Sequence, residues 1–240
     1  MQYLGGKSRI KKEISSLLNL YNKEHKTLVS LFCGTCSIES LAHFENKILN
    51  DSHSYLIQLF LDLQSGREFP EHITADEYYA VKKKLDLDKG LSAFVGFGCS
   101  FGGKWWGGYA RQTKGLNYAK TAKNSLKRKM EGLQKATFLC KDYKDVEISD
   151  GSVVYCDPPY KGTTSYSNSS EFCHKDFWEY MRKISEKNIV LISEISAPKD
   201  FTSIWEKGFT RNLEASNVIK SVEKIFMYNK ENHDSTILQG

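Results

Sequence analysis

Apolar and polar residues follow two different rhythms along the chain. Short apolar runs have the length of buried strands, and they lie at residues 27–32, 47–50, 136–140, 152–156 and 188–193. Longer segments repeat an apolar residue every three or four positions, as one face of a helix requires, and they lie at residues 10–21, 55–63, 76–85, 118–133 and 176–186. Two further strands are expected near residues 210–214 and 223–228. Together these segments predict an α/β protein.

The order of the segments defines the expected fold. The first part reads strand, glycine-containing turn, helix from about Ile38, strand, acid, helix, which begins a doubly wound parallel sheet. Between Gly66 and Lys135 no buried parallel strand is expected, and the α/β rhythm returns only afterwards. We therefore predict a Rossmann-like α/β domain formed by residues 1–65 and 136–240, with a mainly helical subdomain inserted at residues 66–135.

Composition narrows the class of protein. The chain has 240 residues, of which 40% are hydrophobic and 12% aromatic, so it can bury a core and is too apolar for a disordered chain. No apolar run approaches the ~18–20 residues of a membrane-spanning helix, and the first residues contain no apolar signal-peptide core. These features predict a soluble cytoplasmic protein.

Positive charge is concentrated in the predicted insertion. Residues 104–135 contain nine bases and one acid, a net +8, whereas the whole chain carries +5, so the remainder carries −3. Clustered bases with interleaved aromatic residues attract a phosphate backbone, and this predicts nucleic-acid binding. The candidate DNA-binding residues are Lys104, Trp105, Trp106, Tyr109, Arg111, Lys114, Lys123, Lys127 and Arg128. A solvated basic helix without a partner, and aromatic residues that form the subdomain core, are the alternatives.

The cysteines and histidines give no sign of a metal site. Cys33 and Cys36 form a single C-x-x-C, and a zinc site needs a second matching pair, which the sequence lacks. None of the six histidines falls into a ligand pattern. A redox motif is an alternative interpretation of Cys33 and Cys36, but reduced, mostly buried thiols are favoured.

The segment Asp157-Pro158-Pro159-Tyr160 is the most informative motif. It follows a buried strand, where open α/β sheets bind their ligands. A residue before proline is held extended and proline has no N–H, so the segment is stiff and offers acceptors only. Tyr160 adds a flat ring. Rigid acceptors beside a ring suit a planar base with an exocyclic amino group.

This arrangement also suits a reaction at that amino group. An aromatic amine is a poor nucleophile because its lone pair is delocalised into the ring. Hydrogen bonds from both amino protons to the protein favour a pyramidal nitrogen and stabilise the positive charge that develops as it attacks. Holding the nitrogen in line with an electrophile lowers the entropic part of the barrier. We therefore predict that Asp157, Pro158, Pro159 and Tyr160 form the catalytic motif.

The motifs resemble those of the Dam-like, alpha-order family of S-adenosylmethionine-dependent DNA adenine-N6 methyltransferases, especially its small phage-type members. Five elements carry the resemblance in order along nearly the whole chain, namely residues 3–7 (YLGGK), 31–37 (LFCGTCS), 50–51 (ND), 142–143 (DY) and 157–160 (DPPY). The second element departs from the Phe-x-Gly-x-Gly loop of the family because Cys36 replaces its last glycine. A cysteine there restricts the backbone and the approach of a cofactor.

The resemblance implies a role for each motif. Tyr3, Lys7 and the loop of residues 32–34 would line the methionine part of S-adenosylmethionine. Asp51 would accept hydrogen bonds from the ribose hydroxyls, and Asp142 and Tyr143 would lie beside the adenine. The complete set of implied cofactor-binding residues is Tyr3, Gly5, Gly6, Lys7, Phe32, Cys33, Gly34, Asp51, Asp142, Tyr143 and Asp157. A surface lysine at Lys7 and a plain helix cap at Asp51 are the alternatives.

The implied activity is direct transfer of a methyl group to N6 of an adenine that has left double-stranded DNA, with S-adenosylmethionine as cofactor and without a metal. Three alternatives stay open. The enzyme could act on cytosine N4 or on adenine in RNA, and the protein could be a non-catalytic DNA-binding relative on the same fold. An NAD-dependent oxidoreductase is disfavoured because the turn at residues 33–37 is not G-x-G-x-x-G.

Overall fold

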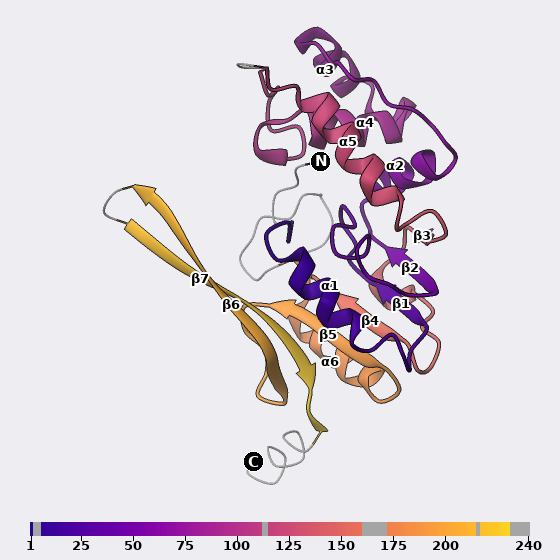
Figure 1. Ribbon diagram of the computed structural model, residues 1–240, viewed down its shortest axis with the longest axis vertical. Coiled ribbons are helices and arrows are strands. Elements are labelled where there is room, and N and C mark those ends of the chain that lie inside the picture. The colour runs from indigo at the N-terminus through magenta and orange to yellow at the C-terminus, as the bar shows by residue number, and fades with distance from the viewer. Residues whose placement is uncertain (2–5, 112–114, 160–171, 215–216, 231–240) are drawn as a thin grey trace. The chain divides into compact units, whose positions relative to one another are not determined.

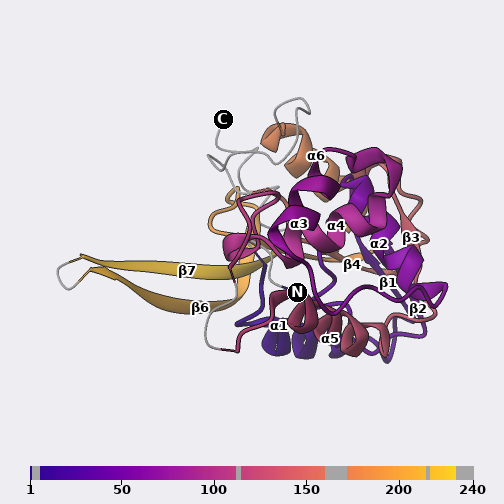
Figure 2. The ribbon, with the colours of Figure 1, turned by 90° about the horizontal axis from the view of Figure 1, so that it is seen from above.

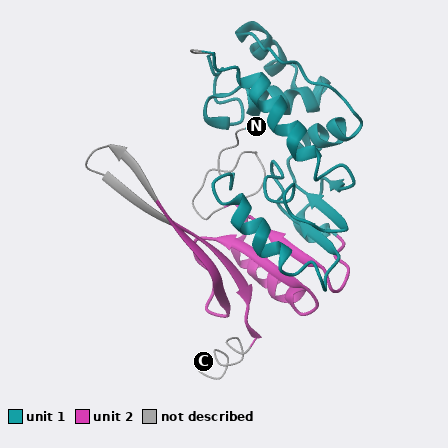
Figure 3. Ribbon diagram, in the orientation of Figure 1, with its two compact units in different colours: residues 1–146 teal, residues 147–240 magenta. Residues whose placement is uncertain are grey.

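The computed structural model describes residues 1, 6–111, 115–159, 172–214 and 217–230. Within it the chain forms two compact units, unit 1 (Met1–Val146) and unit 2 (Glu147–Gly240), which are coloured separately in Figure 3. Each unit is described by itself. The predicted domain boundaries near residues 65 and 135 stay a prediction.

Unit 1 contains parallel strands whose carboxyl ends lie at one edge. The strands are β1 (Thr27–Ser30), β2 (Asn46–Asn50) and β3 (Thr137–Leu139), in the order β3-β2-β1 (Figure 1). Val29 pairs with Ile48, and Ile48 pairs with Thr137. Because parallel strands end at the same edge of a sheet, the residues that follow β1, β2 and β3 lie next to one another.

Helices precede and follow these strands as the periodicity predicts. Helix α1 (Lys11–Asn19) precedes β1 and buries Ile14 and Leu18, and α2 (Ser54–Gln64) follows β2. Phe60 of α2 stacks on Phe138 of β3, with ring centroids 5.2 Å apart and an angle of 7° between the planes. A short 3-10 helix, η3 (Tyr143–Asp145), follows β3.

The regular elements in the described part of the predicted insertion are helices, apart from one isolated bridge between Ser100 and Tyr109. Its elements are α3 (Ala75–Lys82), η1 (Leu85–Leu87), α4 (Lys89–Gly98), η2 (Phe101–Gly103) and α5 (Tyr118–Met130). A capping box at Thr74 and Glu77 starts α3. The side chain of Asn117 accepts from the backbone N–H of Lys120 and starts α5.

Helix α4 is the central helix of this segment, and the sequence pattern did not reveal it. Residues 92–98 of α4 are all buried, so the helix shows no polar face from which a period could be recognised. A Cβ atom at Gly96 would lie 2.6 Å from the Trp105 ring, and one at Gly98 would lie 2.9 Å from Cβ of Ala122. These glycines therefore serve close helix packing.

Unit 2 combines a parallel pair of strands with a long antiparallel hairpin. The elements are β4 (Val153–Cys156), α6 (His174–Ser185), β5 (Ile189–Glu194), β6 (Phe201–Glu214) and β7 (Asn217–Tyr228), and the strand order is β4-β5-β7-β6. Strand β5 pairs parallel with β4 and antiparallel with β7. Figures 1 and 2 show β6 and β7 paired along their length. The strands expected near residues 210–214 and 223–228 are parts of this hairpin.

One local prediction was wrong. Residues 37–41, where a helix was expected from Ile38, form turns. The backbone hydrogen bonds there close single turns, from Ser40 N–H to Cys36 O and from the N–H groups of Leu41 and Ala42 to Ile38 O. The side chain of Glu39 is buried and accepts from the Ser30 hydroxyl, which fixes this segment against the end of β1. No helix in the described part of the chain is long and apolar enough to cross a membrane.

Candidate functional site

Asp51 connects the loop after β1 to the end of β2. Its carboxylate accepts from the backbone N–H of Gly34 at 2.8 Å and from that of His53 at 2.9 Å. The residue is half-buried. A carboxylate has about four lone-pair positions, so two remain for hydroxyl donors. The N-cap of α2 is His53 and not Asp51, so the alternative of a plain helix cap does not fit, while the Asp51 carboxylate still offers acceptors at the edge of the sheet.

Asn50 holds the same edge of the sheet together with a buried side chain, although it was not predicted as a site residue. Its side-chain amide donates to the carbonyls of Leu31 and Lys141, both at 3.1 Å, and its oxygen accepts from the Lys141 N–H at 3.0 Å. The side chain is buried. Asn50 therefore holds the segments after β1 and β3 on either side of β2. A polar residue directly after the apolar pair Ile48 and Leu49, at the end of the strand, was the available signal.

The loop after β1 is a tight turn with two residues in the left-handed region. Cys33 N–H donates to the Asn50 carbonyl at 2.8 Å, and Cys36 N–H donates to the Cys33 carbonyl at 2.7 Å. Gly34 has φ +48° and Cys36 has φ +51°. Gly34 adopts this conformation without cost, whereas for a residue with a Cβ atom it costs about 1–2 kcal/mol. Cys36 keeps the backbone of a glycine at the position where the resembled family has one.

Aromatic side chains stand beside this loop. The ring centroids of Phe32, after β1, and Tyr143, after β3, lie 5.3 Å apart with an angle of 36° between the planes. Asp142 accepts from the Lys144 N–H at 2.9 Å and caps η3. The ends of β1, β2 and β3 thus bring together apolar rings and the Asp51 carboxylate. This set of groups fits a nucleoside cofactor, which needs acceptors for its ribose hydroxyls and apolar surface for its base.

The thiols in the loop are not activated. A hydrogen bond with Cys36, and burial, raise the pKa of Cys33, and burial raises the pKa of Cys36. Both side chains are buried. A reactive redox pair needs an accessible thiol with a lowered pKa, so the structure favours the interpretation of these cysteines as buried, reduced thiols.

The N-terminal motif is described only in part. Tyr3 and Gly5 lie outside the described residues, Gly6 is exposed, and the side chain of Lys7 is buried. Lys7 also ends the turn before α1, since its carbonyl accepts from the Ile10 N–H at 3.0 Å. A surface lysine, the alternative considered for this position, does not fit the burial.

The acidic motif follows β4 in unit 2 as predicted. Strand β4 is buried along its whole length and ends at Cys156. Asp157 is half-buried, Pro158 is buried and Pro159 is exposed, while Tyr160 lies outside the described residues. Burial and the neighbouring Asp157 carboxylate raise the pKa of Cys156.

A second carboxylate stands at the same edge of unit 2. Cys156 of β4 pairs in parallel with Ile192 of β5, so Asp157 and Glu194 follow neighbouring strands near their carboxyl ends. Glu194 is buried, and its Oε2 accepts from the Ile195 N–H at 2.7 Å. The sequence analysis did not single out this residue.

The tryptophans proposed for DNA binding pack inside unit 1. Trp106 is buried among the core residues, and its ring centroid lies 4.9 Å from that of Tyr78. The ring centroid of Trp105 lies 4.6 Å from that of Phe97 and 5.0 Å from that of His53. The hydroxyl of Tyr109 donates to the Ile73 carbonyl at 2.8 Å. These positions agree with the alternative that the aromatic residues form the subdomain core.

The basic candidates differ in what surrounds them. Lys123 forms ion pairs with Glu68 at 2.7 Å and Glu71 at 3.6 Å. Four others are exposed, namely Lys104, Arg111, Lys127 and Arg128, and Lys114 lies outside the described residues. Lys129, which the charge count includes, is buried.

A family model covers most of the sequence. The model of the D12 class N6 adenine-specific DNA methyltransferases matches residues 3–89 and 106–226. The chain belongs to this family. The match includes both candidate sites, from the N-terminal motif through Asp51 and Tyr143 to Asp157. The family resemblance stated from the motifs is thereby confirmed, and this protein is a methyltransferase with S-adenosylmethionine as its cofactor.

Other comparisons add less about this methyltransferase. No curated protein matches the sequence. Among solved structures, a putative RNA methyltransferase from Pyrococcus horikoshii has 9% identity and a TM-score of 0.41, with 91% of this chain and 80% of that chain covered. A putative class I S-adenosylmethionine-dependent methyltransferase from Listeria monocytogenes has 11% identity and a TM-score of 0.41, with 93% and 60% covered. A putative methyltransferase from Streptococcus mutans in complex with SAH has 8% identity and a TM-score of 0.36, with 90% and 96% covered.

The predicted fold class is confirmed for this methyltransferase. Unit 1 combines parallel strands with helices, and unit 2 contains a parallel pair of strands and a helix; the regular elements described between β2 and β3 are helices. The predicted roles of individual site residues stay predictions, and the geometry above defines how each can be tested.

Proposed function

We propose that this protein is a DNA methyltransferase that transfers a methyl group from S-adenosylmethionine to N6 of an adenine flipped out of duplex DNA. The observation that carries the proposal is the position of Asp157-Pro158-Pro159 directly after the buried strand β4, in a chain of the D12 class family. Ligands of open α/β sheets bind beyond the carboxyl ends of strands. The stiff acceptors are therefore at the end of the strand where a ligand is expected.

The residues after β1, β2 and β3 would hold the cofactor. Asp51 has acceptor positions left for the ribose hydroxyls, Phe32 and Tyr143 offer apolar surface, and Asn50 keeps their segments together. Lys7, Cys33, Gly34 and Asp142 belong to the same proposed set. When bound, S-adenosylmethionine supplies an electrophilic methyl group on a positively charged sulfur.

Asp157 and the carbonyls of its motif would accept hydrogen bonds from the two N–H groups of the target adenine's amino group. The hydrogen bonds weaken the delocalisation of the nitrogen lone pair and stabilise the positive charge formed as the nitrogen attacks. A half-buried carboxylate is well suited to this task because partial exclusion of water strengthens its interaction with that charge. The ring of Tyr160 would stack on the flipped base.

Exposed bases would bind the DNA backbone. Lys104, Arg111, Lys127 and Arg128 are the proposed phosphate contacts, because their side chains are exposed. Their contacts would offset the few kcal/mol that base flipping costs. Lys123 contributes less in this proposal, because Glu68 and Glu71 already neutralise it.

The test compares substrates directly. The purified protein is incubated with S-adenosylmethionine carrying a labelled methyl group and with duplex genomic DNA or total RNA, and the products are digested to nucleosides. We expect N6-methyladenine from DNA, at sites that modification-aware sequencing then locates. Label in N4-methylcytosine or only in RNA would replace the proposed substrate, and no transfer to any nucleic acid would contradict the proposal.

A further inference from the structure

Lys129 is a basic residue of α5 that points into unit 1. Its neighbours Lys127 and Arg128 are exposed, whereas 7% of the Lys129 surface is accessible. Burying an ammonium group is costly unless it is hydrogen-bonded. Burial lowers the pKa of Lys129 to about 8. A buried lysine on an otherwise solvated basic face therefore needs a reason for its presence.

The ammonium group of Lys129 bonds to the residues on both sides of Cys36. Its Nζ donates to the Thr35 carbonyl and, at 2.9 Å, to the Ser37 hydroxyl. Cys36 lies between them with φ +51° and with its side chain fully buried. The Lys129 side chain thus bridges the one non-glycine residue in the described loop of residues 33–37 that has a left-handed backbone.

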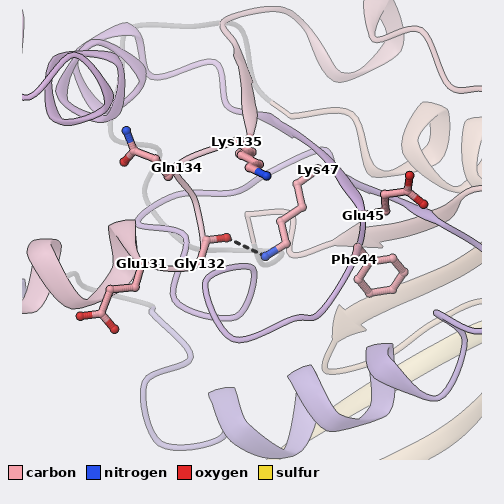
Figure 4. A pocket seen from close by; sticks show the side chains of 8 residues that line it. Phe44, Glu45, Lys47, Glu131, Gly132, Gln134 and Lys135 are labelled. Carbon is pink, nitrogen blue, oxygen red and sulfur yellow. Dashed lines mark hydrogen bonds between the residues drawn. The ribbon is translucent and has the colours of Figure 1, made fainter.

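Further contacts fix the end of α5 to the segment that follows Cys36, and they hold the backbone that carries Lys129 in place. Nζ of Lys47 donates to the Gly132 carbonyl at 2.7 Å, as Figure 4 shows, and to the Glu39 carbonyl at 3.0 Å. A Cβ atom at Gly132 would lie 2.1 Å from the Ser40 carbonyl oxygen. The chain after α5 therefore packs directly on the segment that follows Cys36.

Cys36 needs such support because its conformation is unfavourable for a residue with a Cβ atom. The turn itself supplies two hydrogen bonds, from Cys36 N–H to the Cys33 carbonyl and from Ser40 N–H to the Cys36 carbonyl. The Lys129 ammonium restrains the peptide groups that flank these bonds. A change of the Cys36 backbone would move the Thr35 carbonyl away from Lys129 and shift Gly34, which donates to Asp51.

We propose that Lys129 is a positioning residue that holds Cys36 in the left-handed conformation and so keeps the loop of residues 33–37 in the shape that binds the cofactor. The helix that carries the proposed phosphate contacts thereby also maintains the cofactor loop. The cofactor part of this inference rests on the proposed function. The conformational part rests only on contacts within unit 1.

The test is a double-mutant cycle with Lys129→Met and Cys36→Gly. Methionine keeps the length of the side chain without its charge, and glycine adopts a positive φ without strain. Binding of S-adenosylhomocysteine is measured by calorimetry without DNA, and urea unfolding is measured on the unliganded protein. We expect Lys129→Met to weaken binding by about tenfold, or about 1.4 kcal/mol, with cysteine at position 36, and by less than about threefold with glycine there. In urea unfolding, Lys129→Met should likewise lower the free energy of unfolding more with cysteine than with glycine at position 36.

The controls separate the conformational part of the inference from the part that concerns cofactor binding. Lys120→Met removes an exposed lysine from the same helix and should leave binding and the coupling unchanged. Suppose that the wild-type protein binds S-adenosylhomocysteine and that Lys129→Met weakens this binding equally with cysteine and with glycine at position 36. That result would overturn the inference and leave the proposed function standing. Coupling in unfolding without any binding by the wild-type protein would retain the restraint on Cys36 and contradict the proposed function. Absence of coupling in both measurements overturns the inference in any case.

Discussion

The carboxylate of Asp51 accepts the backbone N–H of Gly34 at 2.8 Å, and so joins the residue after β2 to the loop after β1. One side chain thereby shapes the loop and presents acceptors beside it. We therefore expect removal of the Asp51 carboxylate to have two effects, one on the conformation of the loop and one on the proposed interaction with a ribose.

These two effects can be separated by substitution. We expect Asp51→Ala to weaken S-adenosylhomocysteine binding by about 10–100-fold, because hydrogen bonds to a charged group contribute about 1.5–3 kcal/mol. Asp51→Asn keeps an oxygen that accepts from Gly34 and should weaken binding less. Calorimetric titration measures both, and thermal unfolding confirms that the variants are folded. Equal affinities of Asp51→Ala and wild type would contradict the role of Asp51.

Asn50 should matter for stability more than its place at a strand end suggests. Asn50→Ala leaves two carbonyls and one N–H without their side-chain partner, and a buried unsatisfied group costs about 1–3 kcal/mol. We expect the free energy of unfolding in urea to fall by about 2–3 kcal/mol, compared with under about 0.5 kcal/mol for Asn124→Ala on the exposed side of α5. A decrease as small as that of the control would mean that other contacts hold the two segments.

The sequence predicted those features of the fold and the site that depend on residues close together in the chain. The strands β1, β2 and β4 follow from apolar runs, and the runs of β2 and β4 are followed by Asp51 and Asp157; the structure has these runs as strands. The expected helix at Ile38 was wrong because Glu39 turns inward to the Ser30 hydroxyl, a contact that no periodicity reports.

The missed features depend on partners far away in the sequence. Lys129 is 94 positions from Thr35, and the side chain of Asn50 bonds to Lys141, 91 positions on. In a charge count Lys129 looks like the exposed bases around it, and only the fold shows that it is buried. Trp106 is likewise a core residue that packs on the Tyr78 ring, and Trp105 is partly buried beside it. Long-range packing, and not local pattern, decided these cases.

Asp157 should be required for the chemical step. We expect Asp157→Ala to lower kcat by at least about a hundredfold, as removal of one stabilising hydrogen-bonding group does elsewhere, while the affinity for duplex DNA changes little. Transfer of a labelled methyl group and a filter-binding titration measure the two quantities. Asp150→Ala, which removes an exposed carboxylate paired with Lys187 in the same unit, serves as the control. Full activity of Asp157→Ala would refute the catalytic assignment.

The bases of α5 should contribute to DNA binding according to their partners. We expect replacement of Lys127 and Arg128 by alanine to weaken binding to every duplex and to reduce the slope of log K against log salt by up to ~0.9 for each phosphate that is no longer neutralised. Lys123→Ala should have a smaller effect, because Glu68 and Glu71 pair with Lys123. Titrations at several salt concentrations measure the slopes. An unchanged slope for the double variant would place the DNA on another surface.

The pKa of Lys129 predicts a pH dependence of stability. Burial lowers the pKa to about 8 in the folded protein, against 10.5 in an exposed lysine, although Cys36, Glu39 and Cys33 favour the charged form and Lys11 opposes it. Below pH 8 the group is charged in both states and the folded protein bears the cost of burial. Between pH 8 and 10.5 the unfolded chain binds more protons, so stability rises with pH.

This contribution is isolated by comparison with Lys129→Met, in which the group is absent. We expect the difference in unfolding free energy, wild type minus variant, to be flat from about pH 6 to 7 and to increase from about pH 8 to 9.5, by at most about 1.4 kcal/mol per pH unit. Urea unfolding at each pH measures it, and Lys120→Met shows the response of an exposed lysine on the same helix. A difference that stays flat up to about pH 9.5 would mean that burial does not lower the pKa of Lys129, so that the group stays charged in the folded protein over this range.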